Sequence, residues 1–231
     1  MTLISHKKEF VFIHIYKTAG TAITDSLIKH SCLKDRLAYD FYITEKLANT
    51  VDRIFNTWDY GKKWLTGYHK HAKAFEIREY LGAERFDRYY KFAFVRNTWD
   101  WLASFYFYVK REQTHRDHQL ANQLSFKEYL IYYLSSKPEL QIDFITDSQG
   151  KVIVDEIYRF ENLERDFPKL LDKLNIENKQ AKTELEVMNK STNRSRDYTV
   201  YYDEELISLV ADYFKRDIEH FQFSFDYSLK S

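Results

Sequence analysis

The sequence predicts an α/β fold, in which a central and mostly parallel sheet is flanked by helices in a P-loop-like arrangement of three layers. Two short runs, residues 10–15 and 91–95, are apolar apart from His14 and Lys91. Such runs are typical of strands that are covered on both faces of a sheet. A helical pattern follows each run after a short polar turn, and this alternation of strand and helix is what parallel sheets require.

Composition limits the classes of function. A chain of 231 residues is long enough for a full core, and we expect a single domain over residues 1–231. It carries 35 basic and 35 acidic residues, so no net charge favours nucleic acid or an anionic membrane as a partner. Any anion site must therefore be local. There is one cysteine, no secretory signal and no apolar run of about 18 residues, so we expect a cytoplasmic protein without a membrane span.

The other elements follow from periodicity and capping. The apolar stripe at 21–28 predicts a helix after the first strand. A helix at 74–81 should end at Gly82, since glycine adopts a positive φ at low cost. Ser125 and Glu128 form a capping box that should begin a helix reaching residue 134. The remaining predictions are a helix at 99–110, a β-hairpin at 141–155, a strand at 157–160, a helix at 163–174, a surface loop at 175–198 and a final helix from residue 203.

The first candidate anion site is the turn that leads from the first strand into its helix. Backbone N–H groups at a helix N-terminus bind anions, Gly20 allows close approach of the backbone, and Lys17 adds a full charge. Thr18 and Thr21 add hydroxyl donors. The turn is not a nucleotide-triphosphate loop, because its lysine precedes the glycine by three residues. The alternative is an ordinary structural turn in which Thr21 caps the helix.

The second candidate anion site follows the second strand. Arg96 and Asn97 come at the carboxyl end of this strand, the edge at which open parallel sheets bind ligands, and Ser104 lies in the helix that follows. Arginine is suited to bidentate contact with phosphate. The alternative is that Arg96 pairs with a carboxylate such as Asp100 and that Ser104 is a neutral helix residue.

Together the two stretches resemble the sulfotransferases that use 3′-phosphoadenylyl sulfate, in particular the Golgi-type carbohydrate enzymes and their soluble bacterial relatives. FVFIHIYKTAGT at 10–21 is similar to the 5′-phosphosulfate loop of that family, and KFAFVRNTWDWLASFY at 91–106 to its 3′-phosphate segment. Further matches occur in YRFENLERDF, NKSTNRSRDYTVYYDEELISLV and DIEHFQFSF, so the resemblance covers nearly the whole chain. Three positions depart from the pattern: Tyr16 and Thr98 stand where the family has proline, and Trp101 where it has arginine.

The resemblance implies transfer of a sulfuryl group from 3′-phosphoadenylyl sulfate to an acceptor hydroxyl on a carbohydrate or glycoconjugate, without a metal. It assigns donor binding to Lys17, Thr18, Ala19, Gly20, Thr21, Ala22, Arg96, Ser104, Arg194 and Arg196. It also implies that Lys17 neutralises the leaving phosphate and that His71 or His69 is the general base, with His71 favoured because it lies closer to the helix at 74–81.

Several alternatives stay open at the level of the sequence. The two histidines also fit an exposed loop. Arg194 and Arg196 also fit a site for an anionic acceptor, or a solvated loop. His14 fits a packed core histidine. For the whole chain, the alternatives are a P-loop nucleotide kinase and a non-catalytic nucleotide-binding protein on a degenerate copy of the fold.

Overall fold

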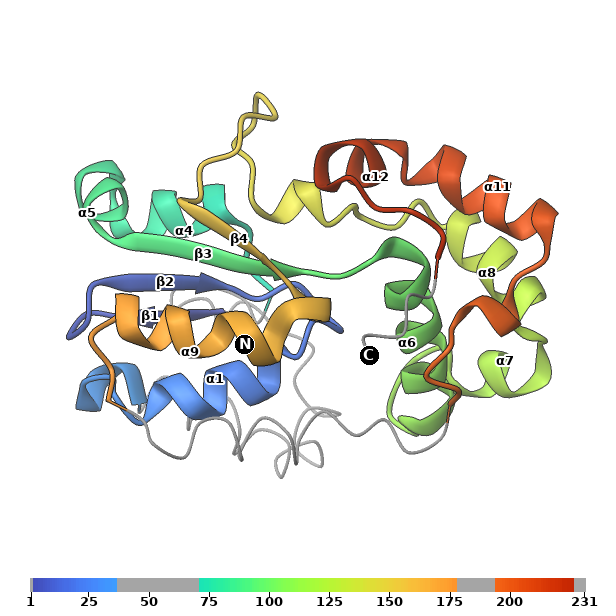
Figure 1. Ribbon diagram of the computed structural model, residues 1–231, viewed down its shortest axis with the longest axis horizontal. Helices are drawn as coiled ribbons and strands as arrows, with labels where there is room; N and C mark the ends of the chain where they lie inside the picture. Colours follow the sequence, from blue (N-terminus) through green and yellow to red (C-terminus); the bar gives the residue numbers. More distant parts are fainter. Residues whose placement is uncertain (1, 37–70, 178–193, 227–231) are drawn as a thin grey trace, which may run out of the picture. The chain divides into compact units, whose positions relative to one another are not determined.

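The computed structural model describes residues 2–36, 71–177 and 194–226, which are drawn in colour in Figure 1. The chain divides into two compact units. The first unit comprises residues 1–95 and 143–189, and the second comprises residues 96–142 and 190–231.

The first unit is built on a four-stranded sheet in the order β1-β2-β3-β4. Its strands are β1 (Leu3–Ser5), β2 (Phe10–Ile13), β3 (Tyr90–Val95) and β4 (Glu156–Arg159). β2, β3 and β4 are mutually parallel, while β1 pairs with β2 in the antiparallel sense. The mostly parallel sheet confirms the predicted fold class, and β1 is an edge strand that the sequence pattern did not predict.

One face of this sheet carries the main apolar core. Phe12 and Phe92 lie opposite each other in the β2–β3 register, and their rings stack with centroids 5.3 Å apart. Two helices cover these rings, α1 (Gly20–Ile28) and α9 (Leu163–Lys173), and supply buried leucines and isoleucines to the same core. The predicted helices at 21–28 and 163–174 are therefore confirmed, with boundaries shifted by one residue.

The other face of the sheet is covered by α4 (Ala74–Leu81) and α5 (Ala83–Arg88). Figure 1 shows these two helices on the opposite side of the strands from α1 and α9. The ammonium of Lys91, on β3, donates to the carbonyl of Asp87 and lies 5.4 Å from the centre of the Phe86 ring. Helices therefore flank both faces, as predicted. Gly82, with a φ of 79°, ends α4 where the sequence indicated.

The second unit is helical. Its helices are α6 (Thr98–Arg111), α7 (His118–Gln123), α8 (Phe126–Ser135), α11 (Glu204–Tyr213) and α12 (Lys215–Phe221). The capping box of α8 is formed as predicted, with both reciprocal hydrogen bonds present. Asp203 caps α11, but the final helix is interrupted at Phe214, where α12 begins. A short 3₁₀ turn at Thr199–Tyr201 also belongs to this unit, another at Phe160–Asn162 belongs to the first unit, and a third, Ile142–Phe144, lies at the boundary in the chain.

The predicted hairpin at 141–155 is only partly correct. Its turn at 147–150 is present, but the two arms share one isolated antiparallel bridge, Thr146 to Val152. The backbone N–H groups of Gln141 and Ile142 donate to the carboxylate of Asp217, each at 2.8 Å. Because this distant carboxylate takes both donors, a strand ladder does not form at the start of the segment.

Trp101 belongs to the core of the second unit. Its side chain is fully buried, and its indole meets the ring of Phe214 edge to face, with centroids 5.7 Å apart. The tryptophan therefore occupies an apolar position on α6, where the resembled pattern has an arginine. Among the described residues, no helix is both long enough and apolar enough to cross a membrane.

We expect Trp101→Arg to lower the free energy of unfolding by more than about 3 kcal/mol, because it removes a large buried ring and places a guanidinium in an apolar site. Trp101→Phe keeps an apolar ring and should cost clearly less. Urea unfolding of both variants measures the difference. Equal stability of the two would show that this position tolerates the charge.

Candidate functional site: an anion-binding turn and an arginine cluster

The first candidate site lies in the first unit, at the carboxyl end of β2. The strand ends at Ile13, the chain turns through residues 14–19, and α1 begins at Gly20. A helix N-terminus placed after a parallel strand presents unpaired N–H groups at the edge of the sheet where ligands bind. This is the turn that the sequence identified.

Gly20 is required here by the ring of His14. An added Cβ at Gly20 would lie 1.8 Å from Cδ2 and 1.9 Å from Nε2 of His14. No side chain can occupy that space unless the buried imidazole moves, and its residue is only 3% exposed. Glycine therefore serves close packing between strand end and helix start.

The backbone of the turn is held in an uncommon conformation. Lys17 has a φ of 62° and Ala19 a φ of 63°, in the left-handed region that non-glycine residues seldom adopt. Ala19 is the N-cap of α1, no side chain caps the helix, and no acidic residue lies in its first turn. Thr21 lies inside the helix and does not cap it, so the structural alternative for Thr21 is wrong. Uncapped N–H groups and local backbone strain are both features of anion-binding turns.

Thr18 stabilises the turn from within. Its hydroxyl is fully buried and donates to the carbonyl of Ile15 at 2.7 Å. The hydroxyl proton is thus used inside the protein, and an anion would meet the backbone N–H of Thr18. Thr21 is exposed on the first turn of α1, whereas Ala22 is buried against the core.

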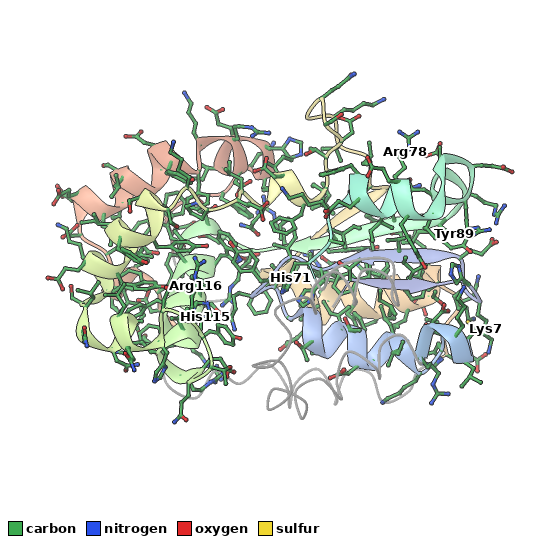
Figure 2. The ribbon with its side chains drawn as sticks, turned by 180° about the vertical axis from the view of Figure 1, so that it is seen from behind. Lys7, His71, Arg78, Tyr89, His115 and Arg116 are labelled. Carbon is green, nitrogen blue, oxygen red and sulfur yellow. The ribbon has the colours of Figure 1, made fainter. Side chains whose placement is uncertain are left out.

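His71 lies beside this turn, three residues before α4 (Figure 2). Its Nδ1 is 2.9 Å from the carbonyl oxygen of His14, and the two imidazole rings are 4.6 Å apart. The ring of Tyr16 meets His71 edge to face at 5.9 Å. A carbonyl can only accept, so Nδ1 carries the proton, and the neutral ring has its lone pair on Nε2. The other candidate base, His69, lies outside the described residues.

Thr2 links the His71 segment to the end of β2, a contact that no sequence pattern predicted. The Thr2 hydroxyl accepts from the N–H of His14 at 3.2 Å and donates to the carbonyl of Ala72 at 3.3 Å. Both partners are buried backbone groups next to the His14–His71 contact. Their separations from Thr2 along the chain, 12 and 70 residues, explain why no local pattern indicated the link.

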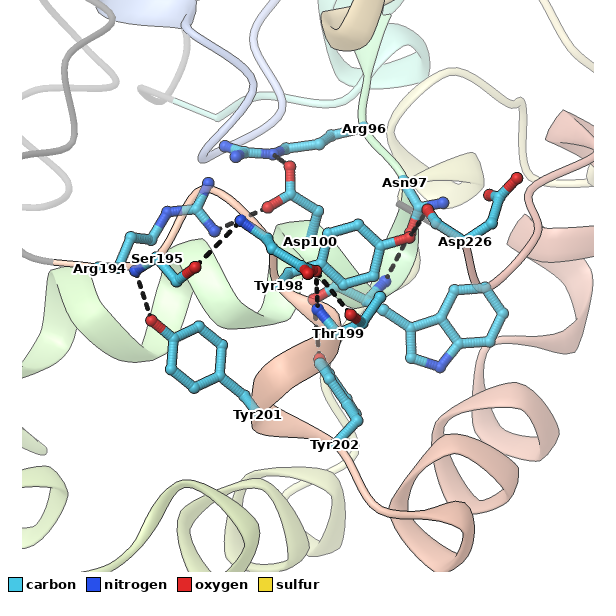
Figure 3. Close-up of polar contacts among 12 residues, drawn as sticks. Arg96, Asn97, Asp100, Arg194, Ser195, Tyr198, Thr199, Tyr201, Tyr202 and Asp226 are labelled. Carbon is cyan, nitrogen blue, oxygen red and sulfur yellow. Dashed lines mark hydrogen bonds and ion pairs between the residues drawn. The ribbon is translucent and has the colours of Figure 1, made fainter. Parts of the chain in front are cut away.

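The second candidate site lies in the second unit and is a cluster of two arginines around Asp100 (Figure 3). Oδ2 of Asp100 is 2.7 Å from Nε of Arg96, and Oδ1 is 2.7 Å from Nη1 of Arg194. Burial opposes ionisation of Asp100, but the charges and hydrogen bonds of the two arginines hold the pKa of its carboxyl below the ordinary 3.8. The carboxylate is therefore ionised at neutral pH.

The expected pairing of Arg96 with Asp100 is thus present. It engages the Nε–H of the guanidinium, and such a pairing is compatible with phosphate binding by the same side chain. Ser104 follows Asp100 by four residues on the same face of α6. Arg196 is exposed, while the Arg194 side chain is 9% exposed.

The backbone of Arg96 is held by Gln141, a residue that sequence reasoning missed. The amide of Gln141 accepts from the Arg96 N–H at 2.9 Å and donates to the Arg96 carbonyl at 2.8 Å. Asp217 in turn holds the backbone of Gln141. Asn97 caps α6 through a bond from the N–H of Trp99 and donates to the carbonyl of Ser224. The backbone of Arg96, just before α6, is therefore held on both sides by hydrogen bonds.

The comparisons with known proteins agree with this description. The chain matches the model of the sulfotransferase family over residues 1–224, and it belongs to that family. It is also 36% identical to an uncharacterized protein of Archaeoglobus fulgidus over 109 residues, which are 45% of this chain and 82% of that protein. No solved structure matches the chain significantly. Members of the family transfer sulfuryl groups, so a sulfuryl donor and an acceptor are implied.

Gly20→Ala should destabilise the protein by about 1–3 kcal/mol, because the added methyl group overlaps the ring of His14. In the double variant Gly20→Ala/His14→Ala the overlap is absent, so its cost should be smaller than the sum of the single costs. Thermal or urea unfolding of the three variants measures this coupling.

Gly150→Ala is the matched control, since Gly150 also has a positive φ but nothing lies within 4 Å of an added Cβ. Its cost should simply add to that of His14→Ala. Full additivity of Gly20→Ala with His14→Ala would contradict the packing described for the turn.

Proposed function

We propose that this protein transfers the sulfuryl group of 3′-phosphoadenylyl sulfate to a hydroxyl of a carbohydrate or glycoconjugate, and that residues 1–231 act as one sulfotransferase domain. The observation that carries the proposal is the turn at residues 14–20, with its strained backbone, its uncapped helix N-terminus and its glycine fitted against His14. Family membership supports the reaction class. The donor and acceptor rest on the resemblance of the motifs, and the carbohydrate acceptor on analogy alone.

In this proposal the turn binds the 5′-phosphosulfate of the donor. The backbone N–H groups from Thr18 to Ala22 face the anion, and the ammonium of Lys17 adds a full positive charge. Because the first turn of α1 contains no carboxylate, nothing there opposes a multiply charged anion. Arg96 and Ser104, with Arg194 or Arg196, are the proposed ligands of the 3′-phosphate.

The reaction is a displacement at sulfur. The acceptor oxygen forms a bond to sulfur, the bond from sulfur to the phosphate oxygen breaks, and adenosine 3′,5′-bisphosphate leaves with the electron pair. Lys17 stabilises the charge that grows on the leaving oxygen. Nε2 of His71 takes the proton of the acceptor hydroxyl, while the bond from Nδ1 to the His14 carbonyl keeps the ring in the required tautomer.

The first test compares nucleotides. The wild-type protein should bind adenosine 3′,5′-bisphosphate more tightly than ATP, because ATP has no 3′-phosphate. Arg96→Ala should weaken bisphosphate binding by about 1.5–3 kcal/mol, the range for a hydrogen bond to a charged group. Isothermal titration calorimetry gives both values, and Arg116→Ala, at a side chain that is 79% exposed, is the control. Equal affinity for ATP and the bisphosphate would favour a kinase-like or non-catalytic protein.

Lys17→Ala should lower turnover much more than it lowers affinity for the product nucleotide, because charge on the bridging oxygen grows as the S–O bond breaks. Steady-state rates with a labelled donor, together with bisphosphate titration, separate the two effects. Lys29→Ala, at the opposite end of α1, is the control and should leave both unchanged. A rise in the Michaelis constant with normal turnover would reduce Lys17 to a binding residue.

His71→Ala should reduce turnover by about a hundredfold or more while nucleotide binding is retained. His71→Asn is more informative, since the amide can donate to the His14 carbonyl as Nδ1 does but cannot take a proton. The His71→Asn variant should fold normally and lose turnover as His71→Ala does. His118→Asn is the matched control, because Nδ1 of His118 also contacts a backbone carbonyl, that of Val109, at 3.1 Å. Normal turnover of His71→Asn would place the base elsewhere.

A further inference from the structure

Asp100 holds two arginines that are far apart in the sequence. Its two carboxylate oxygens each contact one guanidinium at 2.7 Å, and the Arg194 contact spans 94 residues. The side chains of Arg96, Arg194 and Asp100 are 5%, 9% and 12% exposed. Ion pairs that are so well shielded from water keep their geometry and respond weakly to salt. Asp100 is therefore an orienting group and not one half of a loose surface pair.

The segment that carries Arg194 is held within the second unit by other bonds as well (Figure 3). The hydroxyl of Tyr202 donates to the carbonyl of Trp99 at 2.7 Å, and that of Tyr198 donates to the carbonyl of Asp226. The N–H of Ser195 donates to the hydroxyl of Tyr201. These bonds do not involve Asp100, so the segment stays in place when the carboxylate is altered. What the carboxylate adds is the direction of the Arg194 side chain.

One donor of Arg194 has no partner in the part of the chain that the structure describes. Its Nε is buried and has no hydrogen-bond partner among the described residues. Buried guanidinium donors are normally satisfied, since an unmade bond to a buried polar group is costly. Around Asp100, two positive charges share one negative charge, and the arrangement suits an anion with several acceptor oxygens.

We propose that Asp100 is a positioning residue that gives the protein its selectivity for a nucleotide with a 3′-phosphate, by holding the guanidinium groups of Arg96 and Arg194 in one fixed orientation. The inference rests on the proposed function, because that function supplies the phosphate. Each carboxylate oxygen accepts one N–H, and this contact restricts the orientation of the guanidinium before the phosphate arrives.

A positioning role and a simple charge effect of Asp100 change the affinity for the 3′-phosphate in opposite directions. Asp100 is itself an anion beside a site for an anion, so its charge alone weakens phosphate binding. Removing the charge would then strengthen binding of the 3′-phosphate. If Asp100 acts by orienting the arginines, the same removal weakens it.

The test uses Asp100→Asn in the full-length protein, with adenosine 3′,5′-bisphosphate and adenosine 5′-monophosphate as probes. The two nucleotides differ only in the 3′-phosphate, so the ratio of their dissociation constants, monophosphate over bisphosphate, isolates its contribution. Asparagine keeps the shape of the side chain but presents an NH₂ group to one of the guanidiniums. We expect the ratio to fall about tenfold or more, which corresponds to about 1.4 kcal/mol. Asp117→Asn, at another buried carboxylate beside an arginine, is the control and should keep the wild-type ratio.

Each outcome decides a different claim. If the wild-type protein binds the two nucleotides equally well, it does not recognise the 3′-phosphate, and the proposed function is overturned. If the wild type distinguishes them and Asp100→Asn does so equally well or better, the positioning role is overturned. A purely structural role for Asp100 would weaken both nucleotides alike and leave the ratio unchanged, which also overturns the proposal.

A second variant covers the case in which Asp100→Asn does not fold. Arg194→Lys keeps the positive charge but loses the planar fork that the carboxylate orients. We expect the ratio of its dissociation constants, monophosphate over bisphosphate, to fall towards that of a protein without the oriented pair. An unchanged ratio in Arg194→Lys would show that orientation of this side chain does not matter, and would overturn the proposal independently.

Discussion

The contact between His14 and Gly20 is the constraint on which the candidate site in the first unit depends. The imidazole fills the space where any other residue at position 20 would place its Cβ. The N–H of His14 donates to the hydroxyl of Thr2, and its carbonyl accepts a hydrogen bond from His71. The end of β2, the start of α1 and the position of His71 are thus set together by one buried histidine. A substitution at one of these positions should displace the others, because close-packed interiors leave no room for independent movement.

The charge balance of the chain explains why both candidate sites are local constructions. With equal numbers of acidic and basic residues, the protein has no overall field to attract an anion. In the first unit, the turn before α1 relies on oriented backbone N–H groups. In the second unit, Asp100 arranges two arginines, and the side chains that it holds are almost fully buried. In the proposed function, both arrangements would be organised before the anion binds, which would lower the entropic cost of binding.

The three departures from the resembled pattern have different consequences. The ring of Tyr16 makes edge-to-face contacts with both His71 and Phe144, so it adds packing around the candidate base. Thr98 occupies the first position of α6, where a proline is tolerated because a helix does not use the N–H of that position. The cap of α6 is Asn97, so it does not depend on the residue at position 98. Trp101 packs against Phe214 in the core of the second unit. None of the three alters the residues proposed to contact the donor.

The sequence by itself determined the local features: two buried strands, the turns after them, the end of α4 at Gly82 and the capping box of α8. These depend on residues within a few positions of one another, so periodicity and turn chemistry were enough. Tertiary structure decided the rest. It brings together segments that are distant in the chain. Examples are the pairing of β1 with β2, the bonds of Asp217 to the start of the predicted hairpin, the bond of Thr2 to Ala72 and the contact of Asp100 with Arg194. Such contacts depend on how the chain folds back on itself, which no local pattern records.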